Sequence, residues 1–139
     1  HAMVIHVDIV SAEGEIFSGD ADMVFAPAQM GEIGIAPRHA PLLTGLKPGS
    51  VRVQSGDGEK LFYVTGGVLE IQPHLVTVLA DSALHAEQLD EAEALAARDR
   101  ARDMLQGRAE GIDLAAAQAA LVEAEARYRA AQQLKGHRG

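Results

Sequence analysis

The sequence predicts a mainly β plus α fold: an amino-terminal antiparallel β-sandwich followed by a carboxy-terminal antiparallel two-helix hairpin. Of the valine, isoleucine and threonine residues, 19 lie before residue 86, as do all five prolines, and these residue types favour strands and turns. Between residues 86 and 134, 16 of 49 residues are alanine and none is proline, which favours helix. We therefore predict a sandwich over residues 3–86 and a hairpin over residues 87–139.

The strands are predicted from short β-branched runs. The first begins at Ile5, where Ile5, Val7 and Ile9 alternate with less apolar residues and would line one buried face. Further strands are expected at residues 15–18, 22–26, 33–36, 51–54, 60–65, 68–72 and 75–80. Many short strands at close spacing are typical of an antiparallel sandwich or barrel.

Glycines mark two places where the strands should turn. Residues 55–58, Ser-Gly-Asp-Gly, tolerate positive φ, so the strands on either side should form a hairpin. Gly66 and Gly67 interrupt two strand-like runs, which predicts a bulge or a corner where the chain changes sheets.

Two helices are predicted from their end signals. Asp90 and Glu93 form a capping box, with Leu89 and Ala94 as a hydrophobic staple, and this helix should end near Gln106. Gly107 and Gly111 bracket a turn, and Asp113 can cap a second helix that reaches about Leu134.

The helices should pack through a seam of small residues. Positions three and four apart are Ala94, Ala97, Ala101 and Met104 in the first helix and Leu114, Ala117, Leu121, Ala124, Tyr128 and Ala131 in the second. A buried methyl contributes only about 0.8 kcal/mol, so this seam is weak. We expect a detachable hairpin that can fold beside the sandwich or extend from it.

Composition and motifs exclude several function classes. Twenty acidic and 12 basic residues give a net charge of -8, so nucleic acid is not an expected partner. The chain has no cysteine and no apolar run long enough to span a membrane, and no cofactor or metal is expected. The sequence lacks the serine-nucleophile and phosphate-loop motifs. Among the histidines, His39 is the one candidate functional residue.

One segment is unusual in composition. Residues 31–43 combine two prolines with two glycines and several aliphatic residues, which makes a rigid, partly apolar segment. Such a loop suits docking to a partner. A proline-braced crossover inside the sandwich explains the same composition equally well.

At this segment the sequence resembles a known family. GEIGIAPRHAPLLTGLKPG (residues 31–49), VTGGVLEIQPHLVTVLAD (64–81) and DIVSAEGEIFSG (8–19) resemble the epsilon subunit of bacterial F-type ATP synthase in order and spacing. The resemblance continues through LDEAEA (89–94) into the alanine-rich hairpin. It implies the same two-part fold.

The resemblance also implies a noncatalytic role in the central stalk of the proton-translocating complex, on the cytoplasmic face of the bacterial cell membrane. Glu32 matches the position that faces the rotor ring of c subunits, and Ser11, His39 and Thr44 match positions near the gamma subunit. In this family the hairpin can extend into the catalytic alpha/beta head and inhibit ATP hydrolysis. Its basic residues would contact acidic surfaces there: Arg98, Arg100, Arg102, Arg127 and Arg129.

An ATP-sensing regulatory module is the alternative. Some family members bind ATP through an I/L-D-x-x-R-A motif, which Leu89, Asp90 and Ala94 match while Glu93 replaces the arginine. Glu93 would repel phosphate. Arg100 lies where another family arginine is expected, but residues 115–117 are alanines where arginines contribute in the ATP-binding members. We predict weak or absent ATP binding. A third hypothesis, a small β-sandwich enzyme with a helical oligomerisation arm, has no motif in its favour.

Overall fold

The computed structural model describes residues 3–56, 58–89, 91–106 and 114–138. The first part of the chain forms β1 (Ile5–Ser11), β2 (Gly14–Ala21), β3 (Met23–Ala28), β4 (Gly31–Ile35), β5 (Leu42–Leu46), β6 (Gly49–Ser55), β7 (Gly58–Val64), β8 (Gly67–Ile71), β9 (Leu75–Ala80) and β10 (Ala83–His85). A short 3-10 helix, η1 (Ala86–Gln88), leads to α1 (Glu91–Gln106) and α2 (Leu114–Arg138). Strands and helices therefore occupy separate halves of the sequence, as predicted.

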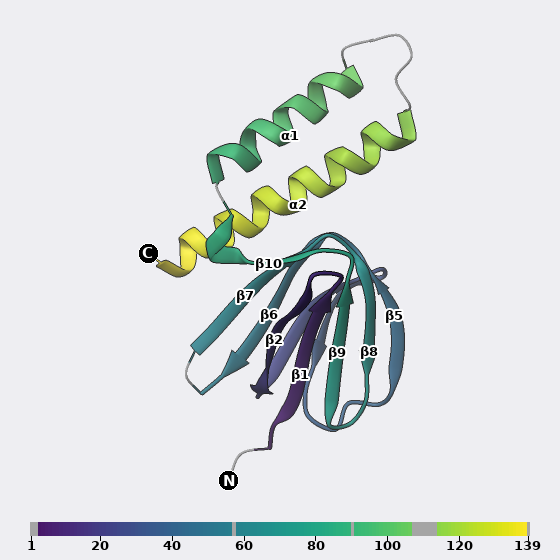
Figure 1. Ribbon diagram of the computed structural model, residues 1–139, viewed down its shortest axis with the longest axis vertical. Helices are drawn as coiled ribbons and strands as arrows, with labels where there is room; N and C mark the ends of the chain where they lie inside the picture. Colours follow the sequence, from purple (N-terminus) through teal and green to yellow (C-terminus); the bar gives the residue numbers. More distant parts are fainter. Residues whose placement is uncertain (1–2, 57, 90, 107–113, 139) are drawn as a thin grey trace.

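The strands form one hydrogen-bonded sheet that folds over into two layers. Its order is β10-β7-β6-β3-β5-β8-β9-β1-β2, with β4 paired to β3. At the fold, β3 and β5 share a single register pair, Ala28 with Leu46. The sheet closes on itself because β2 contacts β6 and β10, which lie far from it in the strand order (Figure 1). The predicted sandwich is confirmed, with one parallel pair, β1 and β9, in an otherwise antiparallel sheet.

Aliphatic side chains from both layers fill the space between them. The largest fully buried side chains of this core are Ile5, Val7, Ile9, Val24, Ile35, Val51, Phe62, Val64, Leu69, Ile71 and Val76. The β1 residues are those whose alternation predicted a half-buried strand, and that prediction is confirmed. All members of the cluster precede Ala86, so the sandwich has a core of its own.

Gly66 and Gly67 form a corner. They connect β7, which pairs with β6 and β10, to β8, which pairs with β5 and β9. Their φ angles are +129° and +133°, and a β-carbon on Gly67 would collide with the main-chain oxygen of Leu79. Glycine is required here both for the backbone conformation and for the close approach of β9. Of the two predicted alternatives, the corner is the one found.

Residues 31–43 are a crossover. The segment contributes β4 to one layer and then, through residues 36–41, carries the chain into β5 of the other. β5 and the short β10 were absent from the predicted strands. The prediction for β5 failed because Pro41 and Gly45 weaken the local strand signal, whereas five register pairs with β8 stabilise the strand in the fold.

The helices match their predicted positions closely. α1 ends at Gln106 as predicted, and α2 extends to Arg138, four residues beyond the predicted Leu134. The predicted cap at Asp90 and the turn from Gly107 to Asp113 lie outside the described residues. α1 and α2 lie side by side and antiparallel (Figure 1).

The predicted seam is correct at four buried alanines: Ala94, Ala101, Ala117 and Ala124. Ala97 is only half-buried, and Ala131 is buried in the cluster with Tyr63, toward the sandwich rather than in the seam. Met104 and Leu114 are 50% and 59% exposed, which contradicts their assignment to the seam. Both lie near the ends of α1 and α2 that point away from the sandwich (Figure 1).

Candidate functional site: docking and regulatory surfaces

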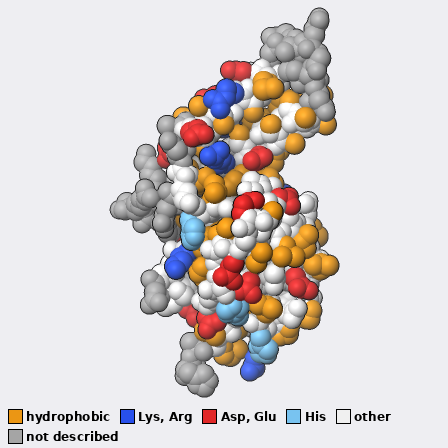
Figure 2. All heavy atoms as spheres, in the orientation of Figure 1, with side chains coloured by type: hydrophobic (Ala, Val, Ile, Leu, Met, Phe, Trp, Pro, Cys, Tyr) orange, Lys and Arg blue, Asp and Glu red, His pale blue; other side chains and the backbone are white. Residues whose placement is uncertain are grey.

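An exposed apolar row lies on the outer face of the β5-β8-β9 layer. Leu43, Val68 and Leu79 are 68%, 40% and 50% exposed. Register places them on one face, because Val68 pairs with Leu79 and with Gly45, two residues from Leu43, while their neighbours Leu69 and Val78 point into the core. Hydrophobic side chains gather on this side of the sandwich (Figure 2). Clustered exposed apolar residues are typical of a protein-docking surface.

The structure does not bring together Ser11, His39 and Thr44, the three residues predicted to lie near the gamma subunit. Ser11 ends β1 and is buried, where its hydroxyl donates a 3.3 Å hydrogen bond to Glu13. Thr44 pairs with the buried Leu69 and so faces inward. His39 is half-buried in the β4–β5 connection, and its Nδ1 lies 2.7 Å from the carbonyl oxygen of Ala40. The three lie along the same layer as the apolar row or in the connection entering it.

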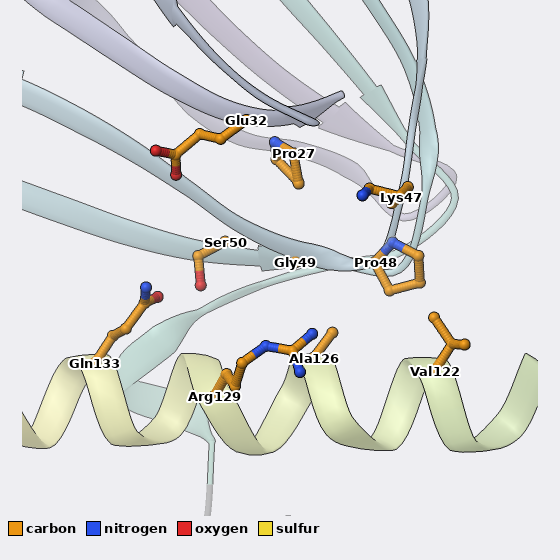
Figure 3. A pocket seen from close by; sticks show the side chains of 10 residues that line it. All are labelled: Pro27, Glu32, Lys47, Pro48, Gly49, Ser50, Val122, Ala126, Arg129 and Gln133. Carbon is orange, nitrogen blue, oxygen red and sulfur yellow. The ribbon is translucent and has the colours of Figure 1, made fainter. Parts of the chain in front are cut away.

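Glu32, the residue predicted to face the rotor ring, lies on β4 beside a groove of about 300 Å³. The opposite wall of the groove belongs to α2, which presents Val122, Ala126, Arg129 and Gln133 (Figure 3). The Glu32 carboxylate lies 3.4 Å from Nη2 of Arg52 and remains largely exposed. Glu32 can therefore accept a further cationic partner, on a surface that also adjoins the hairpin.

The five arginines predicted for regulation fall into three environments. Arg98 and Arg102 bind within the hairpin: Arg98 lies over the Tyr128 ring at 4.8 Å and Arg102 pairs with Glu125 at 3.1 Å. Arg100 and Arg127 line a groove of about 300 Å³ between the helices, and Nε of Arg127 is buried without a hydrogen-bond partner. Arg129 lies in the groove beside Glu32.

Sequence reasoning missed Tyr63, which joins the two halves of the molecule. Its ring is 2% exposed and packs with Leu89, Ala126, Ala130 and Ala131 in a second apolar cluster beneath α2. Its hydroxyl donates a 3.1 Å hydrogen bond to the main-chain oxygen of Glu123 in α2. Burial is the main cause that raises the pKa of Tyr63 above its ordinary value.

A signal for this contact is present in the sequence. Four consecutive apolar residues, 61–64, break the alternation that a half-buried strand shows, and all four are buried. Such a run indicates a strand covered on both faces. In β7, Phe62 and Val64 face the sandwich core, while Tyr63 faces α2.

A polar cluster on β1 and β2 was also missed. His6 lies 3.0 Å from Asp20 through Nδ1 and 3.0 Å from Asp8 through Nε2, and the Ser18 hydroxyl donates to Asp8 at 2.7 Å. The hydrogen bond to Asp20 is the largest cause that raises the pKa of His6, which burial opposes and Asp8 reinforces. Across residues 3–56, 58–89, 91–106 and 114–138, no group of three or more histidines, cysteines or carboxylates could hold a metal ion.

Comparisons with known proteins match both halves of the chain. The family model described as the ATP synthase Delta/Epsilon chain beta-sandwich domain matches residues 4–86. The model described as the Delta/Epsilon chain long alpha-helix domain matches residues 87–132. In the part of the chain that the structure describes, no helix is both long and apolar enough to cross a membrane.

Individual proteins are similar over almost the whole chain. An ATP synthase epsilon chain of Nitrosococcus oceani is 60% identical over 96% of this chain and 96% of its own length. One of Acidithiobacillus ferridurans is 54% identical, covering 96% of this chain and 95% of the relative. A chain of the Euglena gracilis mitochondrial ATP synthase superimposes with a TM-score of 0.82 at 20% identity, covering 93% of this chain and 81% of that one, which shows a shared fold.

Proposed function

This chain belongs to the ATP synthase delta/epsilon family, and we propose that it is a noncatalytic rotor subunit in the central stalk of a proton-translocating F-type ATP synthase. It couples rotation of the rotor ring to ATP synthesis and inhibits ATP hydrolysis through its hairpin. The observation that carries this proposal is the junction between the two halves: α2 rests on a self-contained sandwich mainly through alanine side chains. A hairpin held in this way can leave the sandwich without unfolding it.

Docking is assigned to residues 3–86. The apolar row of Leu43, Val68 and Leu79 provides the surface for the gamma subunit, because it is exposed on the same layer that carries Ser11 and Thr44. Ser11 and Thr44 support that surface from within rather than presenting side chains to it. Glu32 provides the contact to the c-subunit ring, since its carboxylate keeps exposed surface beyond its pairing with Arg52.

Regulation is assigned to residues 87–139. On extension, the arginines of the hairpin meet acidic surfaces of the catalytic alpha/beta head. Arg100, Arg127 and Arg129 make that contact most readily, since Arg98 and Arg102 already bind partners inside the hairpin. The subunit is peripheral to a membrane-bound complex, and we place it on the cytoplasmic face of the bacterial cell membrane, where it associates with the membrane only through the complex.

The test is ATP hydrolysis by an F-type ATPase stripped of this subunit, with the full chain or residues 3–86 added back. The shorter chain retains the complete sandwich core, so it should fold and bind. We expect both forms to bind and only the full chain to slow hydrolysis. Failure of both forms to bind would refute the central-stalk assignment, whereas binding of both without inhibition would refute the regulatory role of the hairpin.

An ATP-sensing module is the second candidate, and the groove between the helices favours it. Arg100 and Arg127 line that groove and could attract phosphate, although Glu123 lies in the same lining. Asp90, the other residue predicted for ATP, lies outside the described residues. Glu93 stands where ATP-binding members carry arginine, so we expect calorimetric titration of the chain with ATP to show weak or no binding. Micromolar affinity would establish this second function.

A further inference from the structure

We propose that Tyr63 is a latch that sets how much of the time the hairpin is docked on the sandwich. The inference rests on the proposed function, in which the docked hairpin is the non-inhibiting state. It adds a specific residue and a specific contact to that function: the phenol of Tyr63 against α2 determines the equilibrium between docked and undocked hairpin.

The position of Tyr63 allows one side chain to bridge two structural units. β7 lies between β6 and β10, and its alternate residues Phe62 and Val64 point into the sandwich core. Tyr63 points to the opposite side of the strand, where α2 crosses over β6 and β7 (Figure 1). The backbone of β7 is therefore fixed by the sandwich, and α2 meets a rigid side chain rather than a mobile loop.

Packing at this contact is unequal between its two sides. On the side of the sandwich, the large side chains of Tyr63 and Leu84 contribute to the cluster. On the side of α2, the contributors are Ala126, Ala130 and Ala131, with one methyl group each. Because each methyl buries little area, no residue of α2 can hold the helix by itself. The phenol ring is the largest apolar group in the contact.

The hydroxyl of Tyr63 adds direction to this packing. It donates to the main-chain oxygen of Glu123 at 3.1 Å, on the same stretch of α2 as Ala126 and Ala130. Inside the helix that oxygen also accepts the usual bond from the amide four residues later. Removing the hydroxyl therefore leaves no buried acceptor without a partner, so Tyr63→Phe should weaken docking without disturbing either half.

Thiol labelling can measure docking directly, because the chain has no cysteine of its own. Ala130 lies on the face of α2 that is buried against Tyr63. The thiol of Ala130→Cys would therefore react only when α2 separates from the sandwich. In this background we expect Tyr63→Phe to accelerate labelling about fivefold, the population change that corresponds to one typical intramolecular hydrogen bond. Ala131 is buried in the same contact. Repeating the measurement with Ala131→Cys checks that the result does not come from a perturbation of docking by the cysteine at position 130.

Two controls make the result specific. Tyr128→Phe removes the other tyrosine hydroxyl of the chain, which accepts a 3.1 Å bond from Gln132 within α2 and does not reach the sandwich, so labelling should not change. A cysteine at Val78, buried in the sandwich core, reports loss of the whole fold. Labelling at Ala130 no faster in Tyr63→Phe than in Tyr128→Phe, or equal acceleration at Val78, would overturn the latch.

Hydrolysis then separates the latch from the proposed function. With the ATPase complex reconstituted, Tyr63→Phe should inhibit hydrolysis more strongly than the unmodified chain, because a larger fraction of hairpins is free to extend. Faster labelling without stronger inhibition supports the latch and contradicts the braking role of the hairpin. Unchanged labelling together with normal inhibition contradicts the latch and leaves the braking role intact.

Discussion

The sandwich and the hairpin differ in what fills their interiors. Isoleucine, valine, leucine and phenylalanine side chains fill the sandwich core, whereas the buried positions between α1 and α2 are mostly alanines. A large aliphatic or aromatic side chain contributes about 1.5–3 kcal/mol when buried, against about 0.8 kcal/mol for a methyl group. Within one chain, the size of the buried side chains therefore makes the sandwich strongly held and the hairpin weakly held.

The contact between the sandwich and the hairpin combines large and small buried side chains. Tyr63 and Leu84 supply large groups from the sandwich, Leu89 supplies one from the segment between η1 and α1, and α2 supplies methyl groups. Docking is consequently sensitive to a single residue, whereas the sandwich core distributes its stability over many. Four further experiments test this difference, in order of decreasing effect.

Phe62→Ala should destabilise the protein by about 3–5 kcal/mol, because the ring is fully buried and packs 5.1 Å from Phe17 and 5.0 Å from His85. Leu121→Ala, in the half-buried α2 surface, should cost less and affect only the helices. Urea unfolding followed both by helical circular dichroism and by labelling of a cysteine at Val78 separates the two regions. Equal losses of unfolding free energy for the two variants would contradict the difference between the sandwich and the hairpin.

Ala124→Gly should destabilise the hairpin by about 1 kcal/mol through helix propensity and by about 0.8 kcal/mol through the lost methyl contact. Ala119→Gly is the matched control, since that alanine is exposed on the same helix and should show only the first effect. Thermal loss of helical circular dichroism measures both. If Ala119→Gly costs as much as Ala124→Gly, the seam contributes nothing to the hairpin.

Protonated His6 should stabilise the sandwich by about 0.5 kcal/mol, a value reduced for solvent screening at this exposed site. Its pKa is raised in the folded state, so the stabilisation is complete below the unfolded pKa of about 6.5 and is lost as pH rises through the folded value. Urea unfolding measures the difference in the free energy of unfolding between the unmodified chain and His6→Gln. This difference should be smaller at about pH 8 than at about pH 6.

The carboxylate partner of His6 provides the control for that experiment. A double-mutant cycle of His6→Gln with Asp20→Asn should give a coupling energy at the lower pH that disappears at the higher pH. A coupling that grows as the pH rises would mean that the neutral ring makes the stabilising contact.

Arg102→Gln should have the smallest effect, about 0.3 kcal/mol, because its pair with Glu125 joins α1 and α2 on a partly exposed surface. Salt screens such a pair, so the difference from the unmodified chain should vanish near 1 M salt. Helical thermal unfolding at low and high salt measures it. A larger, salt-independent loss would show that the aliphatic part of Arg102, rather than its charge, stabilises the helix pair.

The functional roles of Glu32 and of the hairpin arginines come from the family resemblance and stay predictions. What the structure adds is that Glu32 lies beside a groove shared with α2. Sequence reasoning did not reveal the apolar row, because Leu43, Val68 and Leu79 come from three strands and meet only after pairing. Ser11 and Thr44 are polar, yet strand register turns both inward.

Composition and residue patterns are sufficient to define the two halves, both helices, most of the strands and the difference in how strongly each interior is held. Alternation at Ile5, Val7 and Ile9 and the alanine-rich run after residue 86 are local properties, and neighbouring residues are sufficient to express them. Three features depend on long-range contacts: the parallel pairing of β1 with β9, the existence of β5, and the covering of Tyr63 by α2. Each of these depends on groups that are far apart in the chain, so the contact free energy that selects them arises only when the whole fold has formed.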